Sequence, residues 1–234
     1  MTVRNTRKTD ALRRGFLARS ATLLAATRAG FAGAILTAAP LAGAQQLLAT
    51  PRQSKGPFYP VELPADRDAD LMRIGMAPAL ARGEMTHLSG RVFDAGGKLA
   101  GGVRVEIWQC DANGRYHHPG DRGATPLDAN FQGFGATQTD ASGNYAFRTI
   151  KPVPYPGRTP HIHFRLIGAN LPEFVTQMYI AGHPGNDSDG LLMSVRDPRE
   201  RGALLVPFRQ IKGEAGRTEW TAAFDIVLPV RLAA

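Results

Sequence analysis

One strand pattern constrains the fold of this sequence more than any other feature. Ile162, Phe164 and Leu166 alternate with His161 and His163. Side chains two residues apart on a β-strand point to the same face, so the apolar residues face a core and both imidazoles point the other way. Two neighbouring imidazoles offer a metal ion two nitrogen ligands, and imidazole suits zinc, copper, iron and nickel alike.

Similar short alternations recur along the chain, separated by turn-forming residues. The predicted strands are 88–94, 102–109, 145–150, 161–167, 174–181 and 224–228. A short helix is predicted to begin at Asp197-Pro198. Residues 116–137 form a long loop, a length that usually indicates function or disorder. The pattern predicts an all-β fold, a β-sandwich with long functional loops and little helix.

The N-terminus is typical of an export signal. Arg13-Arg14 precedes an apolar stretch over 21–39 and small residues at 42–44. We expect residues 1–44 to be a twin-arginine signal peptide and the protein to be exported, periplasmic or secreted. The alternative is a short membrane anchor, but Arg28 interrupts a weakly apolar segment, so no membrane span is expected in the mature form.

The charge of the chain is concentrated in this segment. The formal net charge is +8, but residues 1–44 hold seven of the 28 Lys and Arg and one of the 20 Asp and Glu, which leaves the remainder at +2. Without a basic patch, nucleic-acid binding is excluded. We expect an N-terminal arm over 45–84 and one catalytic domain over 85–234. Cys110 is the only cysteine and is predicted to be a buried thiol.

Four stretches of the sequence together match the pattern of a known family. They lie at 50–60, 105–116, 126–131 and 147–163. Together they resemble the intradiol ring-cleavage dioxygenases, close to the protocatechuate 3,4-dioxygenase type. The resemblance implies a β-sandwich that holds non-haem Fe(III) with two tyrosinates and two histidines. It also implies that a catechol-type substrate, a 1,2-dihydroxybenzene, is cleaved with O2 to a muconate-type diacid.

Matching the family residue by residue assigns roles in this chain. The implied metal ligands are Tyr155, His161 and His163, and Tyr155 is also the implied general base. Arg158 is the implied substrate-binding and charge-stabilising residue, and Gln177 is the implied polar residue near the iron. Tyr59 is expected to line the substrate pocket, with packing within the arm as the alternative.

Two departures from the family pattern affect the site. The position that we match to the family's other tyrosine ligand is Gly123, and a tryptophan after Tyr-Pro is replaced by Gly157 in a shortened segment. Candidates for the remaining ligand lie in the same loop. They are Asp121, Tyr116 and the histidine pair His117 and His118. Asp121 would complete a two-histidine, one-carboxylate set that suits Fe(II). The structural alternatives are a solvated loop acid, a packed aromatic and an exposed histidine pair.

Three functions follow from these residues. The first is a ring-cleaving dioxygenase acting on a small aromatic diol, and the second is a metal-binding relative that has lost this activity. The third is a non-catalytic β-sandwich binding module. The residues do not identify the catechol, and a homo-oligomer or a monomer is equally compatible with them.

Overall fold

The computed structural model describes residues 47–213 and 217–232, so the predicted signal peptide, residues 1–44, lies outside the described residues. The chain divides into two units, Met1–Gly43 and Ala44–Ala234, and every described residue belongs to the second. Within the described ranges, no helix has the length and apolar character needed to cross a bilayer.

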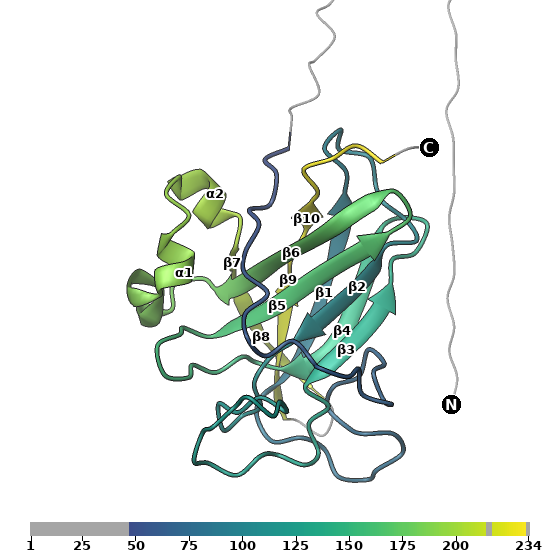
Figure 1. The fold of residues 1–234 in the computed structure, drawn as a ribbon. Helices are drawn as coiled ribbons and strands as arrows, with labels where there is room; N and C mark the ends of the chain where they lie inside the picture. Colours follow the sequence, from purple (N-terminus) through teal and green to yellow (C-terminus); the bar gives the residue numbers. More distant parts are fainter. Residues whose placement is uncertain (1–46, 214–216, 233–234) are drawn as a thin grey trace, which may run out of the picture. The chain divides into compact units, whose positions relative to one another are not determined.

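Two five-stranded sheets make up this unit, which confirms the predicted all-β sandwich with little helix (Figure 1). In the first sheet β4, β9 and β10 all pair with β1, and β8 pairs with β9. Its strands are β1 (Met85–Phe93), β4 (Asn144–Ile150), β8 (Phe208–Lys212), β9 (Thr218–Ala223) and β10 (Ile226–Val227). The order in the second sheet is β3-β2-β5-β6-β7, which places β5 at its centre. Its strands are β2 (Arg104–Trp108), β3 (Phe134–Gln138), β5 (His161–Gly168), β6 (Leu171–Ile180) and β7 (Leu205–Val206).

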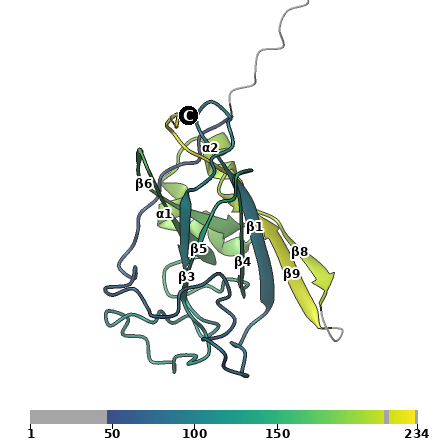
Figure 2. The ribbon, with the colours of Figure 1, turned by 90° about the vertical axis from the view of Figure 1, so that its right-hand side faces the viewer.

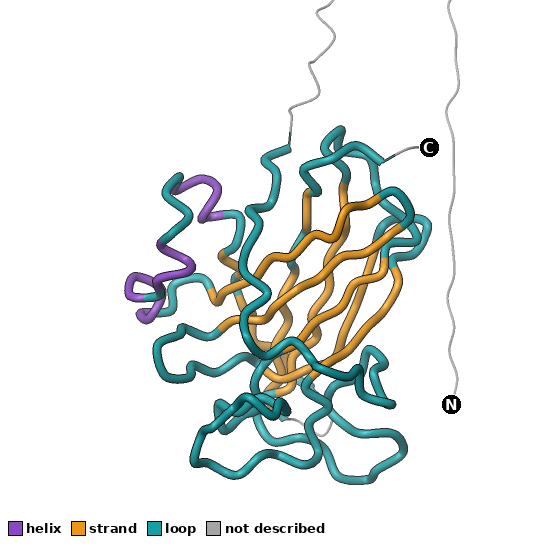
Figure 3. The backbone as a smooth tube through the Cα atoms, in the orientation of Figure 1, coloured by secondary structure: helices purple, strands orange, loops and turns teal. Residues whose placement is uncertain are grey.

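Among the described residues, helix is confined to one connection, between β6 and β7. It contains the 3-10 helix η1 (Pro184–Ser188) and the short helices α1 (Gly190–Met193) and α2 (Pro198–Gly202). The side chain of Asp197 accepts a hydrogen bond from Arg199 N, which confirms the predicted helix start. Long loops gather at one end of the strands (Figure 3), and a view turned by 90° places β8 and β9 on the opposite side from β6 (Figure 2).

An apolar core fills the space between the sheets. Ile162, Phe164 and Leu166 of β5 are fully buried in it, which confirms the predicted face of that strand. Phe164 meets Phe224 of the first sheet's C-terminal segment edge to face, with ring centroids 5.1 Å apart. The two histidines of β5 therefore lie on the other side of the second sheet.

The strands β7, β8 and β9 were not predicted, and two of the predicted boundaries are wrong in ways that affect the fold. The long loop ends at residue 133 rather than 137, because 134–138 form β3 and pair in register with β2. Glycine is depleted in β-strands, so Gly135 argued against a strand at this position. It is needed because a Cβ there would lie 2.5 Å from Leu71 Cδ1. The last strand is also shorter than predicted, since only Ile226–Val227 pair as β10.

The segment before β1 closes the second sheet on its histidine side. Gln53 N donates to Val175 O over 2.9 Å, which ties the start of this arm to β6. Farther along, the hydroxyl of Tyr59 donates to the buried carboxylate of Glu106 over 2.9 Å, and Arg165 Nη1 donates to the same oxygen over 3.0 Å. Both faces of the second sheet are thus covered.

We expect Gly90→Ala on β1 to lower the free energy of unfolding by roughly 3 kcal/mol, the upper range for overpacking. A Cβ at Gly90 would lie 2.0 Å from the carbonyl oxygen of Phe224, a backbone atom that cannot rotate away. Denaturant unfolding measures the change. Gly190→Ala is the matched control, because a Cβ there has no atom within 4 Å. Equal unfolding midpoints for the two variants would contradict this packing.

Candidate metal centre

His161 and His163 lie side by side on β5 in a buried polar site. They are 1% and 2% exposed, and their ring centroids are 4.9 Å apart. The strand register places Trp108 of β2 and Gln177 of β6 opposite His163, and Tyr179 of β6 opposite His161. Cross-strand neighbours share a face of the sheet, so these three side chains form the floor of the site.

The ring of His161 has a defined orientation. Its Nδ1 lies 2.6 Å from the carbonyl oxygen of Thr159. A carbonyl only accepts, so Nδ1 carries the hydrogen and Nε2 keeps its lone pair. A ring fixed in this way is typical of a metal-ligating histidine.

His163 is held between an aromatic ring and the arm. Its imidazole stacks on the indole of Trp108, with centroids 4.8 Å apart and an angle of 8° between the planes. On the arm, Gly56 has φ of 70°, and a Cβ there would lie 3.3 Å from His163 Cε1. A glycine at this position allows the backbone to take the left-handed conformation and to lie close against the ring.

Tyr116 brings a phenol to the histidines. It is 3% exposed, and its hydroxyl lies 3.5 Å from His161 Nε2. Phe58 of the arm stacks on its ring at 4.6 Å. Of the ligand candidates in this loop, Tyr116 is the one that the structure places at the histidines.

Tyr155 and Arg158 are brought together by a tight turn. Tyr155 N donates to Arg158 O over 3.3 Å, and Arg158 N donates to Tyr155 O over 2.9 Å. The central Pro156-Gly157 pair suits a type II turn, because Gly157 has φ of 82°. The shortened segment therefore does not remove Tyr155 from the site. Its ring lies 5.4 Å from the ring of His161 and meets Tyr116 edge to face.

Arg158 is fixed by three acceptors that include the predicted Gln177. Its Nη2 donates to Gln177 Oε1 over 2.7 Å and to the hydroxyl oxygen of Tyr179 over 3.3 Å, and its Nε donates to Asp189 Oδ2 over 2.8 Å. Gln177 Nε2 in turn donates to Ser54 O of the arm. Gln177 is therefore a positioning residue for Arg158.

Asp189 is a residue that sequence reasoning missed. Its buried carboxylate accepts from Arg158 and from Thr159 N, and it also caps α1 by accepting from Leu192 N over 2.9 Å. One side chain thus fixes both the arginine and the segment that orients His161. The only sequence signal was an acid two residues before an apolar pair at 191–192, which is a common surface cap as well.

Burial sets the protonation of the site. Burial and the nearby charge of Arg158 lower the pKa of His161 to about 4, and burial together with His161 lowers the pKa of His163 well below its usual value. Both imidazoles are therefore neutral at neutral pH, the form that binds a metal. Burial also raises the pKa values of the Tyr116 and Tyr155 phenols.

The other ligand candidates do not reach the histidines. The Asp121 carboxylate accepts from Arg115 Nε over 3.0 Å, from Tyr116 N over 2.6 Å and from Gly123 N over 2.8 Å. It shapes the loop that presents Tyr116. Within 47–213 and 217–232, no three His, Cys, Asp or Glu side chains converge on a metal position, so the two-histidine, one-carboxylate set is not formed.

His118 and Gly123 also take structural positions. His118 Nδ1 accepts from Gly120 N over 2.9 Å, and its ring meets Phe58 edge to face. A Cβ at Gly123 would lie 2.4 Å from Arg115 Cδ. A larger residue at this position would displace Arg115. The lack of a tyrosine at position 123 does not leave the site with a single phenol, because Tyr116 supplies one beside Tyr155.

Tyr59 does not line the site as expected. Its ring meets Trp108 edge to face, and its hydroxyl is bound to Glu106 and Arg165. Phe58, the preceding residue, contacts Tyr116 instead. Cys110 is buried as predicted, and burial raises its pKa to about 12, so it is an unreactive thiol.

We expect Asp189→Asn to lower the free energy of unfolding at neutral pH by about 3 kcal/mol, as for a broken buried ion pair. Burial opposes ionisation of Asp189, but the hydrogen bonds from Leu192 N, Arg158 and Thr159 N outweigh it and lower its pKa. A lowered pKa stabilises the fold above the unfolded value of about 3.9, and this stabilisation is lost as the pH falls through the folded value.

Unfolding experiments between pH 7 and pH 3 test this expectation. The difference between the wild type and Asp189→Asn should shrink toward acid pH. Asp187→Asn, at an exposed acid two residues earlier, is the control and should change stability little at any pH. A pH-independent difference for Asp189→Asn would contradict the charged role.

Comparisons with known proteins identify the family of the chain. A family model described as Dioxygenase matches residues 54–229. The chain is 43% identical over 141 residues to the protocatechuate 3,4-dioxygenase beta chain of Burkholderia cepacia, covering 57% of this chain and 60% of the relative. It is 26% identical to catechol 1,2-dioxygenase of Candida albicans, covering 74% and 60%. The chain thus spans about 60% of the length of these two curated relatives.

Solved structures give the same result. The dioxygenase domain of a carbohydrate-binding fusion protein from Streptomyces sp. SirexAA-E has a TM-score of 0.57 and 31% identity, covering 78% of this chain and 99% of that domain. Catechol 1,2-dioxygenase from Acinetobacter sp. ADP1 has a TM-score of 0.59 and 26% identity, covering 79% and 64%. The chain therefore belongs to the dioxygenase family that includes these intradiol ring-cleavage enzymes.

Proposed function

We propose that this protein is a non-haem iron intradiol dioxygenase that opens the ring of a catechol-type substrate with O2 to give a muconate-type diacid. The observation that carries the proposal is the convergence of Tyr116, Tyr155, His161 and His163 in one buried site. The names of the relatives support the reaction class, since they act on catechol, hydroxyquinol or protocatechuate.

The donor set fits ferric iron. Two neutral imidazoles and two phenols supply nitrogen and hard oxygen donors, and two phenolates would offset the charge of a trivalent ion. We therefore assign Tyr116, Tyr155, His161 and His163 as the residues that would hold Fe(III). When bound, the iron would supply the redox chemistry between the aromatic diol and O2.

The protein groups around this position have separate tasks. As a phenolate, Tyr155 would accept a proton from a substrate hydroxyl as general base. Burial raises the pKa of this phenol, and the charge of Arg158 beside it opposes that rise. The guanidinium of Arg158 would stabilise negative charge on the substrate ring, and its three acceptors hold it in place before the substrate arrives. The Phe58 and Trp108 rings shield the site from water.

Loss of activity was the rival function because of Gly123. The reason to expect lost activity was a missing tyrosine ligand. Because Tyr116 offers a second phenol, we favour retained ring cleavage. We also propose export through residues 1–44, which rests on the sequence alone: the Arg13-Arg14 pair, the apolar stretch over 21–39 and the small residues at 42–44. A homo-oligomer stays a prediction.

Turnover of catechol by the iron-loaded full chain in 18O2 tests the reaction. We expect O2 uptake and a diacid that carries both 18O atoms. Catechol binding without O2 uptake would support the inactive relative instead, and no iron binding would favour the non-catalytic module.

Arg158→Lys separates electrostatics from iron binding in the same assay. Lysine keeps the charge but cannot donate to Asp189, Gln177 and Tyr179 in the same fork geometry. We expect kcat to fall by roughly 100-fold with unchanged iron content, as for loss of a charge-stabilising donor. Arg196→Lys at an exposed position is the control and should leave kcat unchanged.

A further inference from the structure

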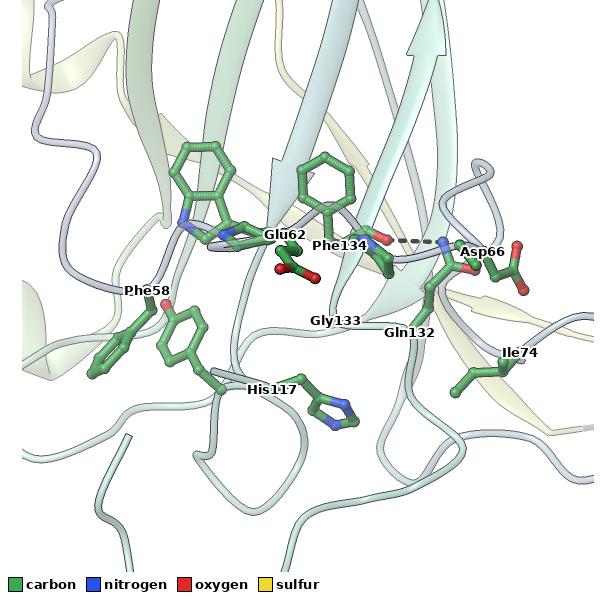
Figure 4. A pocket seen from close by; sticks show the side chains of 13 residues that line it. Phe58, Glu62, Asp66, Ile74, His117, Gln132, Gly133 and Phe134 are labelled. Atoms are coloured by element: carbon green, nitrogen blue, oxygen red, sulfur yellow. Dashed lines mark hydrogen bonds between the residues drawn. The ribbon is translucent and has the colours of Figure 1, made fainter. Parts of the chain in front are cut away.

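A cavity of about 360 Å³ lies against Tyr116 and Trp108 (Figure 4). A cavity of about 150 Å³ already binds benzene, so this volume holds a substituted aromatic ring. Its walls are mainly apolar. They include Phe58, Pro60, Pro64, Ile74 and Phe134.

Two buried polar atoms on the walls have no hydrogen-bond partner among the described residues. They are the indole nitrogen of Trp108 and the Oε1 atom of Gln132. Gln132 Nε2 donates to Asp68 O over 3.0 Å and to Phe134 O over 2.8 Å, and Figure 4 shows the second bond. Because carbonyls only accept, the amide cannot be flipped, and Oε1 is the free acceptor. Both residues line the cavity, so a ligand here would lie beside one donor and one acceptor that have no partner among the described residues.

The charge of the lining selects against anions. Glu62 and Asp66 line the cavity, and the described residues around it include no Lys or Arg. A carboxylate in this space would face two acids, and the one basic side chain on the described lining is the imidazole of His117. A hydroxyl or ether oxygen suits the Trp108 N–H, and a hydroxyl also donates to Gln132.

We propose that this cavity binds an uncharged aromatic group that bears a hydroxyl. The group is either the distal ring of a two-ring catechol or a separate phenol. The first case rests on the proposed function and names its substrate class as extended, uncharged catechols. In both cases the group contacts the same lining residues. Tyr116 and Trp108 line the cavity and also contact the two histidines, so the cavity adjoins the candidate metal centre.

The indole N–H signals in 15N NMR of the iron-free full chain test the cavity without any turnover. The chain has two tryptophans, and Trp220→Phe assigns the signal of Trp108. With 4-methoxyphenol we expect a saturable downfield shift of the Trp108 signal alone. The anion 4-methoxybenzoate should cause no shift of this signal in the wild type. The Glu62→Lys variant should bind 4-methoxybenzoate. The control Glu200→Lys, at an exposed acid in α2, should not bind it.

Ile74→Phe fills the cavity from its rim and should weaken 4-methoxyphenol binding by roughly tenfold or more. Ile211→Phe is the matched control, because the two isoleucines are 39% and 38% exposed. An unmoved Trp108 signal, equal binding of phenol and benzoate, or no effect of Ile74→Phe would overturn the proposal.

Kinetics of the iron-loaded chain then distinguish the two sources. If the group is a distal ring, Ile74→Phe should lower kcat/KM for an uncharged 4-aryl catechol relative to that for catechol by about tenfold. An unchanged ratio together with phenol binding assigns the cavity to a separate phenol. If neither catechol is cleaved, the proposed function fails, while the NMR result still decides the cavity.

Discussion

Burial of both faces of β5 is the constraint on which the rest of the structure depends. One face must pack Ile162, Phe164 and Leu166 into the apolar core, so the alternate residues point out of the sandwich. An outward face normally meets water. Here the arm and the long loop cover it, and His161 and His163 become neutral, buried donors.

The cover is held by polar contacts as well as by a second, smaller apolar cluster around Trp108 and Tyr116. Glu106 is buried on β2 and accepts from Tyr59 and Arg165, which anchors the arm across the sheet. Asp189 ties the helical connection to Arg158 and Thr159. A buried carboxylate with all its partners present fixes one arrangement, because loss of any partner leaves a costly charge. The site is thus positioned from three separate parts of the chain.

Alternation and turn chemistry predicted the β-sandwich and six of its strands, but not β3, β7, β8 or β9. The histidine pair, the core face of β5 and the start of α2 followed from local pattern, because strand and cap rules act within a few residues. β3 escaped prediction because Gly135 is explained only by the distant Leu71 that packs on it. The same limit applied to the site. The position of Tyr116 depends on the loop that Asp121 shapes, and the role of Asp189 depends on a contact across 31 residues with Arg158.

The proposed site requires that Tyr116 and Tyr155 both act as ligands of ferric iron beside the two histidines. The visible absorption spectrum of the iron-loaded full chain tests it most directly, recorded for the wild type, Tyr116→Phe, Tyr155→Phe and the control Tyr145→Phe. We expect a tyrosinate-to-Fe(III) band that loses intensity in each of the first two variants and is unchanged in the third. A colourless protein with iron bound, or a band that survives in Tyr116→Phe at full intensity, would contradict it.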